Sequence, residues 1–262
     1  MTAPLKLCFF DIDDTLCIKG ELWPDNGAAL RELHAAGLTL GIATGRSLPM
    51  VPPDIGQLLR EGILTATVCA NGQHNCLDGR ELSALALPPA ELEALIGLCH
   101  KYGLIYQLAG RERVALSEYL PRYDAVASVF PCFTINPNFH REAEIYQFSV
   151  HVPLDFDPGP LEAELDRLNF HYVSWHGPGA DLIPWRTSKL DGVRTVATAL
   201  GYGLENVMAF GDGLNDVQLL QGVGLGVAMG NGRDEVKALA DYVTLPLDAG
   251  GIRAALRHFQ LI

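Results

Sequence analysis

The sequence lacks several features that would point to particular classes of protein. It contains no cluster of lysine and arginine residues, and its 19 basic residues are outnumbered by 31 acidic ones, giving a formal net charge of −12. Nucleic acids and anionic membranes bind basic surfaces, so neither is an expected partner. No uninterrupted apolar run approaches the roughly 20 residues that a membrane-spanning helix needs.

The six cysteines show neither a CxxC pair nor the spacing of a zinc site. Several of them lie in apolar, strand-like runs, so we expect small buried side chains in a reducing cytosol. The segment from Met1 to Lys6 leads into an apolar strand without the charged, apolar and small-residue regions of a signal peptide. We therefore expect a cytoplasmic protein.

Strand-like and helix-like patterns alternate at both ends of the chain. Asp25 or Asn26 can cap a helix that runs through Ala36, with Gly37 behind it as a stop. Helical spacing recurs at residues 190–200. Apolar strands are expected at residues 5–10, 38–43, 66–70, 207–210, 225–228 and 242–245. This alternation predicts an α/β fold with a doubly wound, parallel, Rossmann-like sheet.

The middle of the chain has a different texture. It holds most of the tyrosines and histidines, together with stretches rich in proline and glycine. Helical spacing at residues 89–102 and 160–168 is mixed with strand-like runs at residues 105–109, 147–152 and 172–175. We therefore predict an inserted α+β domain at residues 82–183 and a core made of residues 1–81 and 184–262.

Asp11 and Asp13 directly follow the first strand, in Phe-Phe-Asp-Ile-Asp-Asp-Thr-Leu. The carboxyl end of a parallel strand is where open α/β folds bind ligands, and alternation sends both side chains to the same side. Two such close carboxylates repel each other and resist desolvation, so they favour a bound cation. Mg²⁺ takes oxygen ligands and suits this pair. Alternatively, both are solvated turn residues, with Asp13 or Asp14 capping a helix.

Three further polar groups are expected at the same edge of the sheet. Thr44-Gly-Arg follows the second strand and offers a hydroxyl and backbone N–H groups suited to an anion. Asp212 and Asp216 are four residues apart in a glycine-containing turn, and Lys189 stands where the inserted segment returns to the core. Taken singly, these features are also typical of an ordinary turn, a favourable charge at a helix N-terminus and a surface lysine.

Together, the motifs resemble those of the haloacid dehalogenase superfamily, specifically the Cof-type phosphatases of subclass IIB. The matching segments, in order, are Asp11-Ile-Asp-Asp-Thr-Leu, Thr44-Gly-Arg, Lys189 and Gly211-Asp-Gly-Leu-Asn-Asp. Three shorter segments, Ala70-Asn-Gly, Ala228-Met-Gly-Asn and Ala240-Asp-Tyr-Val, also match. The resemblance covers nearly the whole chain, and it implies a Rossmann-like core with an inserted cap domain.

The resemblance also implies a role for each matching residue. Asp11 would attack phosphorus to form an aspartyl-phosphate, and Asp13 would act as general acid and then as general base. A side-chain oxygen of Asp11 and the backbone carbonyl of Asp13 would bind Mg²⁺. Asp212 would be another metal ligand, with Asp216 as a further ligand or as an outer partner. Arg46 belongs to the family pattern, but we assign it no catalytic role.

The phosphoryl group would be bound by a second set of residues. Thr44, the backbone of Gly45 and Lys189 would bind its oxygens, where charge must be stabilised during transfer. Asn71 and Asn215 are candidates for the layer behind these ligands, with hydrogen bonding of loop backbone as the alternative.

The inserted domain would then be a cap that selects the substrate. Its candidate contacts are Tyr146, His151, His171, Trp175, His176, Arg111, Arg113 and Arg141. For each of them, packing or surface exposure is the alternative.

The expected function is Mg²⁺-dependent hydrolysis of small phosphorylated metabolites, with sugar phosphates as one class. A sugar phosphomutase of the same family stays open, because it would use the same aspartyl-phosphate. A non-catalytic sensor of a phosphorylated ligand also stays open, although a pure binder would gain nothing from a reactive Asp11. The sequence shows no exposed heptad pattern or apolar interface stripe from which an oligomeric state could be predicted.

Overall fold

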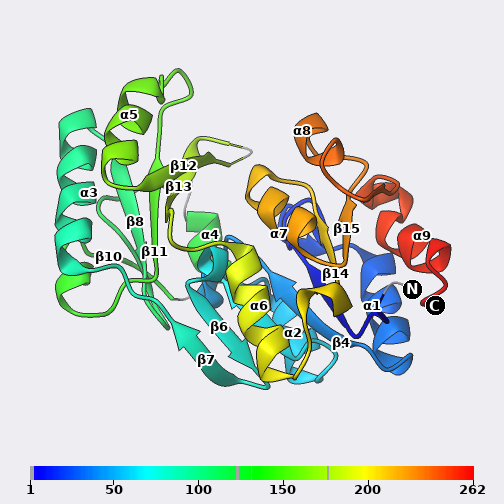
Figure 1. Ribbon diagram of the computed structural model, residues 1–262. Helices are drawn as coiled ribbons and strands as arrows, with labels where there is room; N and C mark the ends of the chain where they lie inside the picture. Colours follow the sequence, from blue (N-terminus) through cyan, green and yellow to red (C-terminus); the bar gives the residue numbers. More distant parts are fainter. Residues whose placement is uncertain (1–2, 122–123, 131, 176) are drawn as a thin grey trace. The chain divides into compact units, whose positions relative to one another are not determined.

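The computed structural model describes residues 3–121, 124–130, 132–175 and 177–262. Its chain divides into two compact units, which are coloured along the sequence in Figure 1. The first unit contains Met1–Arg46, Val51–Ser83 and Ser188–Ile262, and the second contains Ser47–Met50 and Ala84–Thr187.

The first unit is centred on an eight-stranded sheet in the order β16-β15-β14-β1-β4-β5-β6-β7. These strands are β1 (Leu7–Phe10), β4 (Thr39–Ala43), β5 (Ala66–Cys69), β6 (His74–Leu77), β7 (Arg80–Ala84), β14 (Val207–Gly211), β15 (Leu225–Ala228) and β16 (Tyr242–Val243). The six strands from β16 to β5 are parallel, whereas β6 pairs antiparallel with β5. The predicted α/β fold with a parallel Rossmann-like sheet is confirmed, and β6 and β7 extend it at one edge. A short hairpin, β2 (Cys17–Ile18) and β3 (Glu21–Leu22), follows β1.

Helices cover both faces of this sheet (Figure 1). They are α1 (Pro24–Ala35), α2 (Pro53–Arg60), α6 (Lys189–Ala199), α7 (Val217–Gly222), α8 (Asp234–Lys237) and α9 (Gly251–His258). Short 3-10 turns are η2 (Ala70–Gly72), η5 (Leu204–Asn206), η6 (Leu214–Asp216) and η7 (Leu247–Ala249). Val193 of α6 and Leu219 of α7 share a buried core with Leu7 and Phe9 of β1. The central strand is therefore shielded from water, and its carboxyl end is held in a fixed place.

Helix α1 begins earlier than its predicted cap. Trp23 occupies the N-cap position with Pro24 behind it, and no side chain caps this helix. Proline suits the first helical position, because the N–H that it lacks would have no intrahelical partner there. Asn26 instead donates hydrogen bonds to two backbone carbonyls of the loop after β1. The prediction that Asp25 or Asn26 caps this helix was wrong.

The second unit is built on a six-stranded sheet in the order β10-β9-β8-β11-β13-β12. Its strands are β8 (Ile105–Ala109), β9 (Val114–Leu116), β10 (Phe133–Ile135), β11 (Gln147–His151), β12 (Phe170–Ser174) and β13 (Gly179–Pro184). Its helices are α3 (Pro89–Tyr102), α4 (Asp124–Val129) and α5 (Gly159–Arg167), with 3-10 turns η1 (Leu48–Met50) and η4 (Phe139–Arg141). Leu95 of α3, Leu165 of α5 and Phe148 of β11 lie in one buried core. This unit therefore has an apolar centre of its own.

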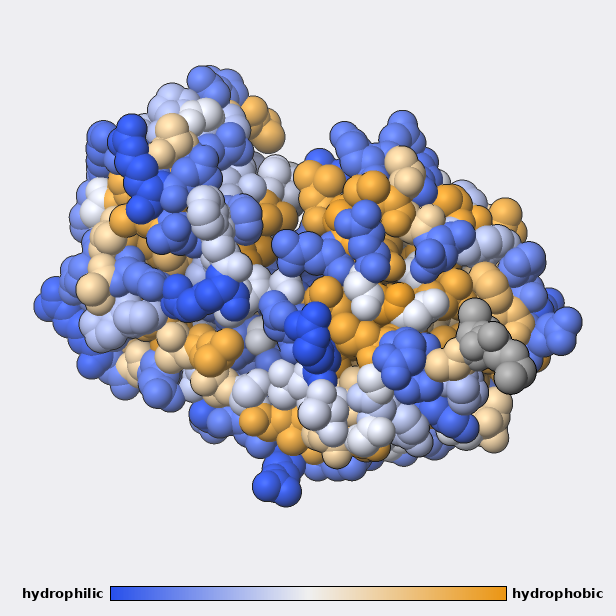
Figure 2. Space-filling view, in the orientation of Figure 1, coloured by the Kyte–Doolittle hydropathy of each residue, from blue (hydrophilic) through white to orange (hydrophobic). Residues whose placement is uncertain are grey.

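The surface mixes polar and apolar residues over the face drawn in Figure 2. On that face, hydrophobic side chains gather over the part of the first unit around α7. Within the described ranges, no helix combines the length and apolar character that crossing a membrane requires.

A substitution at Gly72 tests how closely η2 packs against the start of α6. A Cβ atom at this position would overlap the carbonyl oxygen of Ser188, and the φ of +90° is one that L side chains rarely adopt. Since Ser188 directly precedes α6, the added methyl group must displace the helix start or the turn. We expect Gly72→Ala to lower the free energy of unfolding, measured by urea denaturation, by at least about 3 kcal/mol.

Gly62→Ala is the matched control. Gly62 also has a positive φ, of +72°, but a Cβ atom there would meet nothing within 4 Å. Only the backbone conformation is then unfavourable, so we expect a loss of about 1 kcal/mol. Equal losses in the two variants would contradict the close approach of Gly72 to Ser188.

Candidate active site

Asp11 and Asp212 are brought together by the pairing of β1 with β14. These parallel strands place Phe10 opposite Phe210, and the two rings stack with centroids 5.1 Å apart. The backbone N–H of Asp11 donates to the carbonyl oxygen of Phe210 at 3.0 Å. The two aspartates therefore follow neighbouring strands at the same edge of the sheet, as the sequence predicted.

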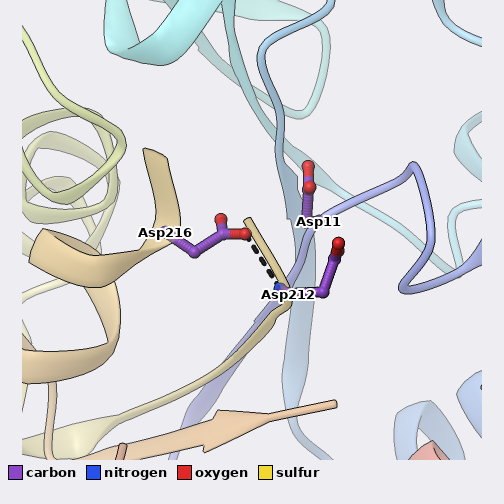
Figure 3. Close-up of side chains that lie close together, drawn as sticks. All are labelled: Asp11, Asp212 and Asp216. Atoms are coloured by element: carbon purple, nitrogen blue, oxygen red, sulfur yellow. Dashed lines mark hydrogen bonds between the residues drawn. The ribbon is translucent and has the colours of Figure 1, made fainter. Parts of the chain in front are cut away.

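Asp11, Asp212 and Asp216 form a cluster of buried carboxylates (Figure 3). Each of them offers a side-chain oxygen, and these oxygens all lie within 4.8 Å of one another. Carboxylate oxygens are the hard ligands that Mg²⁺ prefers. The donor set thus fits the predicted metal.

Lys189 supplies positive charge to this cluster. Its Nζ lies 2.9 Å from Oδ1 of Asp11 and 2.7 Å from Oδ1 of Asp216, and its side chain is fully buried. Lys189 is the first residue of α6, whose start is capped by the Ser188 hydroxyl accepting from the Asp191 N–H. Burial alone would lower the pKa of Lys189, but the two carboxylates outweigh burial and raise it. The ammonium therefore stays charged.

The side chain of Asp216 is engaged by protein groups on both oxygens. Oδ1 accepts the hydrogen bond from Lys189, and Oδ2 accepts from the backbone N–H groups of Asp212 and Gly213, each at 3.0 Å. Figure 3 draws the first of these backbone bonds. Asp216 thereby fixes both the lysine and the turn that carries Asp212. These contacts suit an outer partner of the metal better than a direct ligand.

Crowding raises the pKa of two carboxyl groups. Burial raises the pKa of Asp11 to about 7; the Lys189 ammonium lowers it, and the carboxylates of Asp216 and Asp13 raise it. Burial, followed by the charges of Asp11 and Asp216, raises the pKa of Asp212 to about 8. A single ammonium therefore leaves these carboxylates short of positive charge, and a bound cation would supply it.

The predicted phosphate-binding residue Thr44 follows β4 and is buried. Its backbone N–H donates to the carbonyl oxygen of Val68, and its hydroxyl oxygen accepts from the N–H of Arg46 at 3.1 Å. Its carbonyl oxygen accepts from the N–H of Asn71 at 3.0 Å. Asn215 donates from Nδ2 to Oδ1 of Asn71 at 3.0 Å, so this amide pair joins the turns after β5 and β14. The contacts agree with the alternative that both asparagines order the loops.

Asp13 stands apart from the buried carboxylates. Its side chain is 47% exposed and forms an ion pair with Arg46. Nε of Arg46 donates to Oδ2 at 2.7 Å, and Nη2 donates to Oδ1 at 2.8 Å. Two carboxylates separated by one residue thus have different surroundings, although alternation along an extended strand predicted a shared one.

Two side chains that hold the site were not among the residues predicted from the sequence. The Thr15 hydroxyl donates to Oδ1 of Asp212 at 2.8 Å. Asn231 donates from Nδ2 to the carbonyl oxygen of Asp14 and accepts from the N–H of Leu247, both at 2.8 Å. Both residues lie in segments that match the family, which was the available signal. Their partners are distant in sequence and became visible only in the fold.

The candidate substrate contacts of the second unit have mixed environments. Tyr146 is buried, and its hydroxyl accepts from Arg111 at 3.2 Å. His151 is buried, with its ring centroid 5.4 Å from that of Trp175. His176 lies outside the described residues. Their contact with substrate stays a prediction.

Comparison with known proteins agrees with this geometry. The family of haloacid dehalogenase-like hydrolases matches residues 8–256. The chain belongs to this family. Nearly all of both units lie within the match, so the resemblance seen in the motifs is confirmed over the whole fold.

Several relatives of this hydrolase are named as phosphatases. A Streptococcus pyogenes protein, provisionally named a bifunctional phosphatase/peptidyl-prolyl cis-trans isomerase, is 31% identical over 262 residues. That alignment covers 98% of this chain but 54% of the relative, so the chain spans about half of that protein's length. The 5-amino-6-(5-phospho-D-ribitylamino)uracil phosphatase YcsE of Bacillus subtilis is 27% identical over 98% of this chain and 96% of its own.

A solved structure shares both the fold and the subclass. The subclass IIB sugar phosphatase BT4131 superposes with a TM-score of 0.84 at 27% identity, over 98% of this chain and 100% of the other. The family match and these relatives support phosphatase activity for this chain.

Thermal unfolding with and without Mg²⁺ tests the metal site. Because the pKa values of Asp11 and Asp212 are raised to about 7 and about 8, the folded protein binds protons more tightly than the unfolded chain. Without metal, its stability should therefore fall as the pH rises from about 4 to about 8. Mg²⁺ competes with these protons, so we expect it to raise the melting temperature, and to raise it more at about pH 8 than at about pH 5.

Asp212→Asn provides the comparison for this measurement. The substitution removes one predicted metal ligand and one buried negative charge, so it should abolish most of the Mg²⁺-dependent increase in melting temperature. It should also make the metal-free protein more stable at about pH 8 than the parent. An increase of the same size in both proteins would contradict the assignment of Asp212 as a ligand.

Proposed function

We propose that this phosphatase hydrolyses small phosphorylated metabolites in a Mg²⁺-dependent reaction that passes through an aspartyl-phosphate on Asp11. The observation that carries the proposal is the contact of a buried lysine with the candidate nucleophile, within the cluster of Asp11, Asp212 and Asp216. An anionic phosphoryl group needs local positive charge to enter a protein whose net charge is −12. Lys189 provides part of that charge.

The first step forms the phosphoenzyme. A carboxylate oxygen of Asp11 attacks phosphorus, and the bond from phosphorus to the leaving oxygen breaks. Asp13 donates a proton to that oxygen, so the product leaves as an alcohol. Lys189 orients Asp11 through its contact with Oδ1. Asp11 and Asp13 thus share the work of one displacement.

The second step regenerates Asp11. Asp13 takes a proton from a water molecule that attacks phosphorus, and the bond between phosphorus and the Asp11 oxygen breaks. Thr44, the backbone of Gly45 and Lys189 would bind the phosphoryl oxygens in both steps. Bound Mg²⁺ would supply charge neutralisation, held by Asp11, Asp212 and the carbonyl oxygen of Asp13.

The substrate class rests on the relatives. A pyridoxal phosphate phosphatase of Escherichia coli, YbhA, is 29% identical over 91% of this chain and 92% of its own. YcsE and BT4131 are named for other phosphorylated metabolites. This variety supports a small phosphorylated metabolite, with sugar phosphates as the first class to test. We propose the second unit as the specificity domain; a cytosolic location stays a prediction.

Phosphate release from a panel of phosphorylated metabolites, with and without Mg²⁺, tests this function. We expect Mg²⁺-dependent release by the parent and a loss of at least about 10³-fold in Asp11→Asn. Asp54→Asn is the control, since Asp54 is exposed and contacts the backbone N–H of Leu22, away from the phosphoryl-transfer residues. It should keep parental activity.

Mass spectrometry of the quenched parent should show one added phosphoryl group, which Asp11→Asn should lack. A folded, Mg²⁺-loaded parent that releases phosphate from no compound would contradict the proposal. Transfer of phosphate to another position of the same sugar, without release, would identify a mutase instead.

A further inference from the structure

Arg46 and Asp13 form a two-point ion pair beside the candidate active site. Nε and Nη2 of the guanidinium donate to the two carboxylate oxygens, at 2.7 and 2.8 Å respectively. In such an arrangement two parallel hydrogen bonds fix the plane of the carboxylate as well as its distance. A lysine at this position could provide charge but could not fix that plane.

The backbone of Arg46 is itself held by the phosphate-binding turn. Its N–H donates to the hydroxyl oxygen of Thr44 at 3.1 Å, and its carbonyl oxygen accepts from the N–H of Ala70 at 2.8 Å. The guanidinium therefore extends from a backbone anchored on both sides. A shift in the position of Thr44 would therefore move Arg46, and with it the Asp13 carboxylate.

The loop that carries Asp13 is also constrained. Asp14 has a φ of +56°, and its N–H donates to the carbonyl oxygen of Cys17 at 2.9 Å. The Asp13 side chain is nevertheless about half exposed, so its backbone alone does not select one rotamer. The contact with Arg46 supplies the missing restraint.

The stability of the fold depends little on this pair. The side chains of Arg46 and Asp13 are 24% and 47% exposed, and ion pairs with such access to water contribute little to folding. Lys189, in contrast, is fully buried between Asp11 and Asp216. Removing Lys189 would leave the buried carboxylates of Asp11 and Asp216 without its charge, whereas removing Arg46 would leave the carboxylate of Asp13, which is half exposed to water.

We propose that Arg46 is a positioning residue that contributes to catalysis through Asp13. The guanidinium holds the Asp13 carboxylate in the orientation from which it takes a proton from the attacking water, and that proton is then passed to the leaving oxygen of the next substrate. This inference rests on the proposed function, because Asp13 must take part in phosphate ester hydrolysis. It assigns a role to a residue for which the sequence indicated none.

A double-mutant cycle with Arg46→Ala and Asp13→Asn tests the inference. Steady-state phosphate release is measured with the best substrate of the panel, over a range of substrate concentrations and with enough enzyme for slow variants to remain measurable. We expect R46A to lower kcat by about 10- to 50-fold, which is part of the ~10²- to 10⁴-fold that a general acid and base contributes. KM should change by less than about threefold, because the phosphoryl group keeps its own ligands.

The effect of R46A in the D13N background decides whether Arg46 acts through Asp13. In the D13N background, R46A should lower the rate by less than about twofold, since the group that Arg46 positions is already disabled. Millimolar guanidinium should restore part of the activity of R46A and none of that of the double variant. Arg46→Lys should keep the charge but recover only part of kcat.

Arg31→Ala is the matched control. Arg31 forms a surface ion pair with Glu61 in the same unit, so its loss should leave kcat and KM at parental values. R46A should melt close to the parent, because its ion pair adds little stability. These measurements separate an effect on chemistry from a general effect of removing an arginine.

Three results would overturn the inference. Equal losses from R46A in the parent and D13N backgrounds would show that Arg46 does not act through Asp13. A rise in KM without a fall in kcat would show that it binds substrate directly. A folded parent that hydrolyses no substrate would remove the proposed function and this inference together, whereas an active parent with independent effects would remove the inference alone.

Discussion

The repulsion between buried carboxylates is the constraint on which the site depends. Asp11, Asp212 and Asp216 place oxygens within 4.8 Å of one another in a part of the sheet that excludes water. Such a group cannot remain ionised without nearby positive charge. Lys189 contacts two of the three carboxylates, and the remaining deficit of positive charge would favour a bound cation. With such a cation bound, the site would have the positive charge that an anionic substrate needs.

The position of Lys189 explains several features of the first unit. The chain re-enters this unit at Ser188, whose hydroxyl caps α6. Because Lys189 is the first residue of α6, the position of the helix start fixes the position of the lysine. Gly72 gives that start room, because a side chain there would overlap the Ser188 carbonyl. Gly192 lies one turn further along, where a Cβ atom would collide with Val68 and Asn75. The close packing of α6 against β5 and β6 therefore helps to hold the Lys189 ammonium beside Asp11 and Asp216.

Asp11 and Asp13 show how one short segment can supply two kinds of carboxylate. Asp11 is buried and contacts an ammonium, whereas Asp13 is half exposed and is held by a guanidinium. In the proposed mechanism, proton transfer and nucleophilic attack require carboxylates of different character, and the different surroundings of Asp13 and Asp11 would provide it. The turn after β1 produces it: the positive φ of Asp14 bends the chain, and Asn231 holds the carbonyl oxygen of that residue.

Local sequence patterns determined much of the fold. The predicted bounds of α3 and β8 agree with the structure, because their apolar spacing is set by neighbours along the chain. The motifs also placed the acidic residues at the ends of β1 and β14. Strand β13 was missed: it contains Asp181, a buried carboxylate that accepts hydrogen bonds from Gln147 and Ser149 of β11. The ion pairs of Lys189 and Arg46 likewise join distant segments.

The sequence by itself determined which chemical groups the site contains and at which strand ends they lie. Only the tertiary structure decided which groups are paired and buried, because hydrogen bonds and desolvation depend on neighbours that strand pairing brings together.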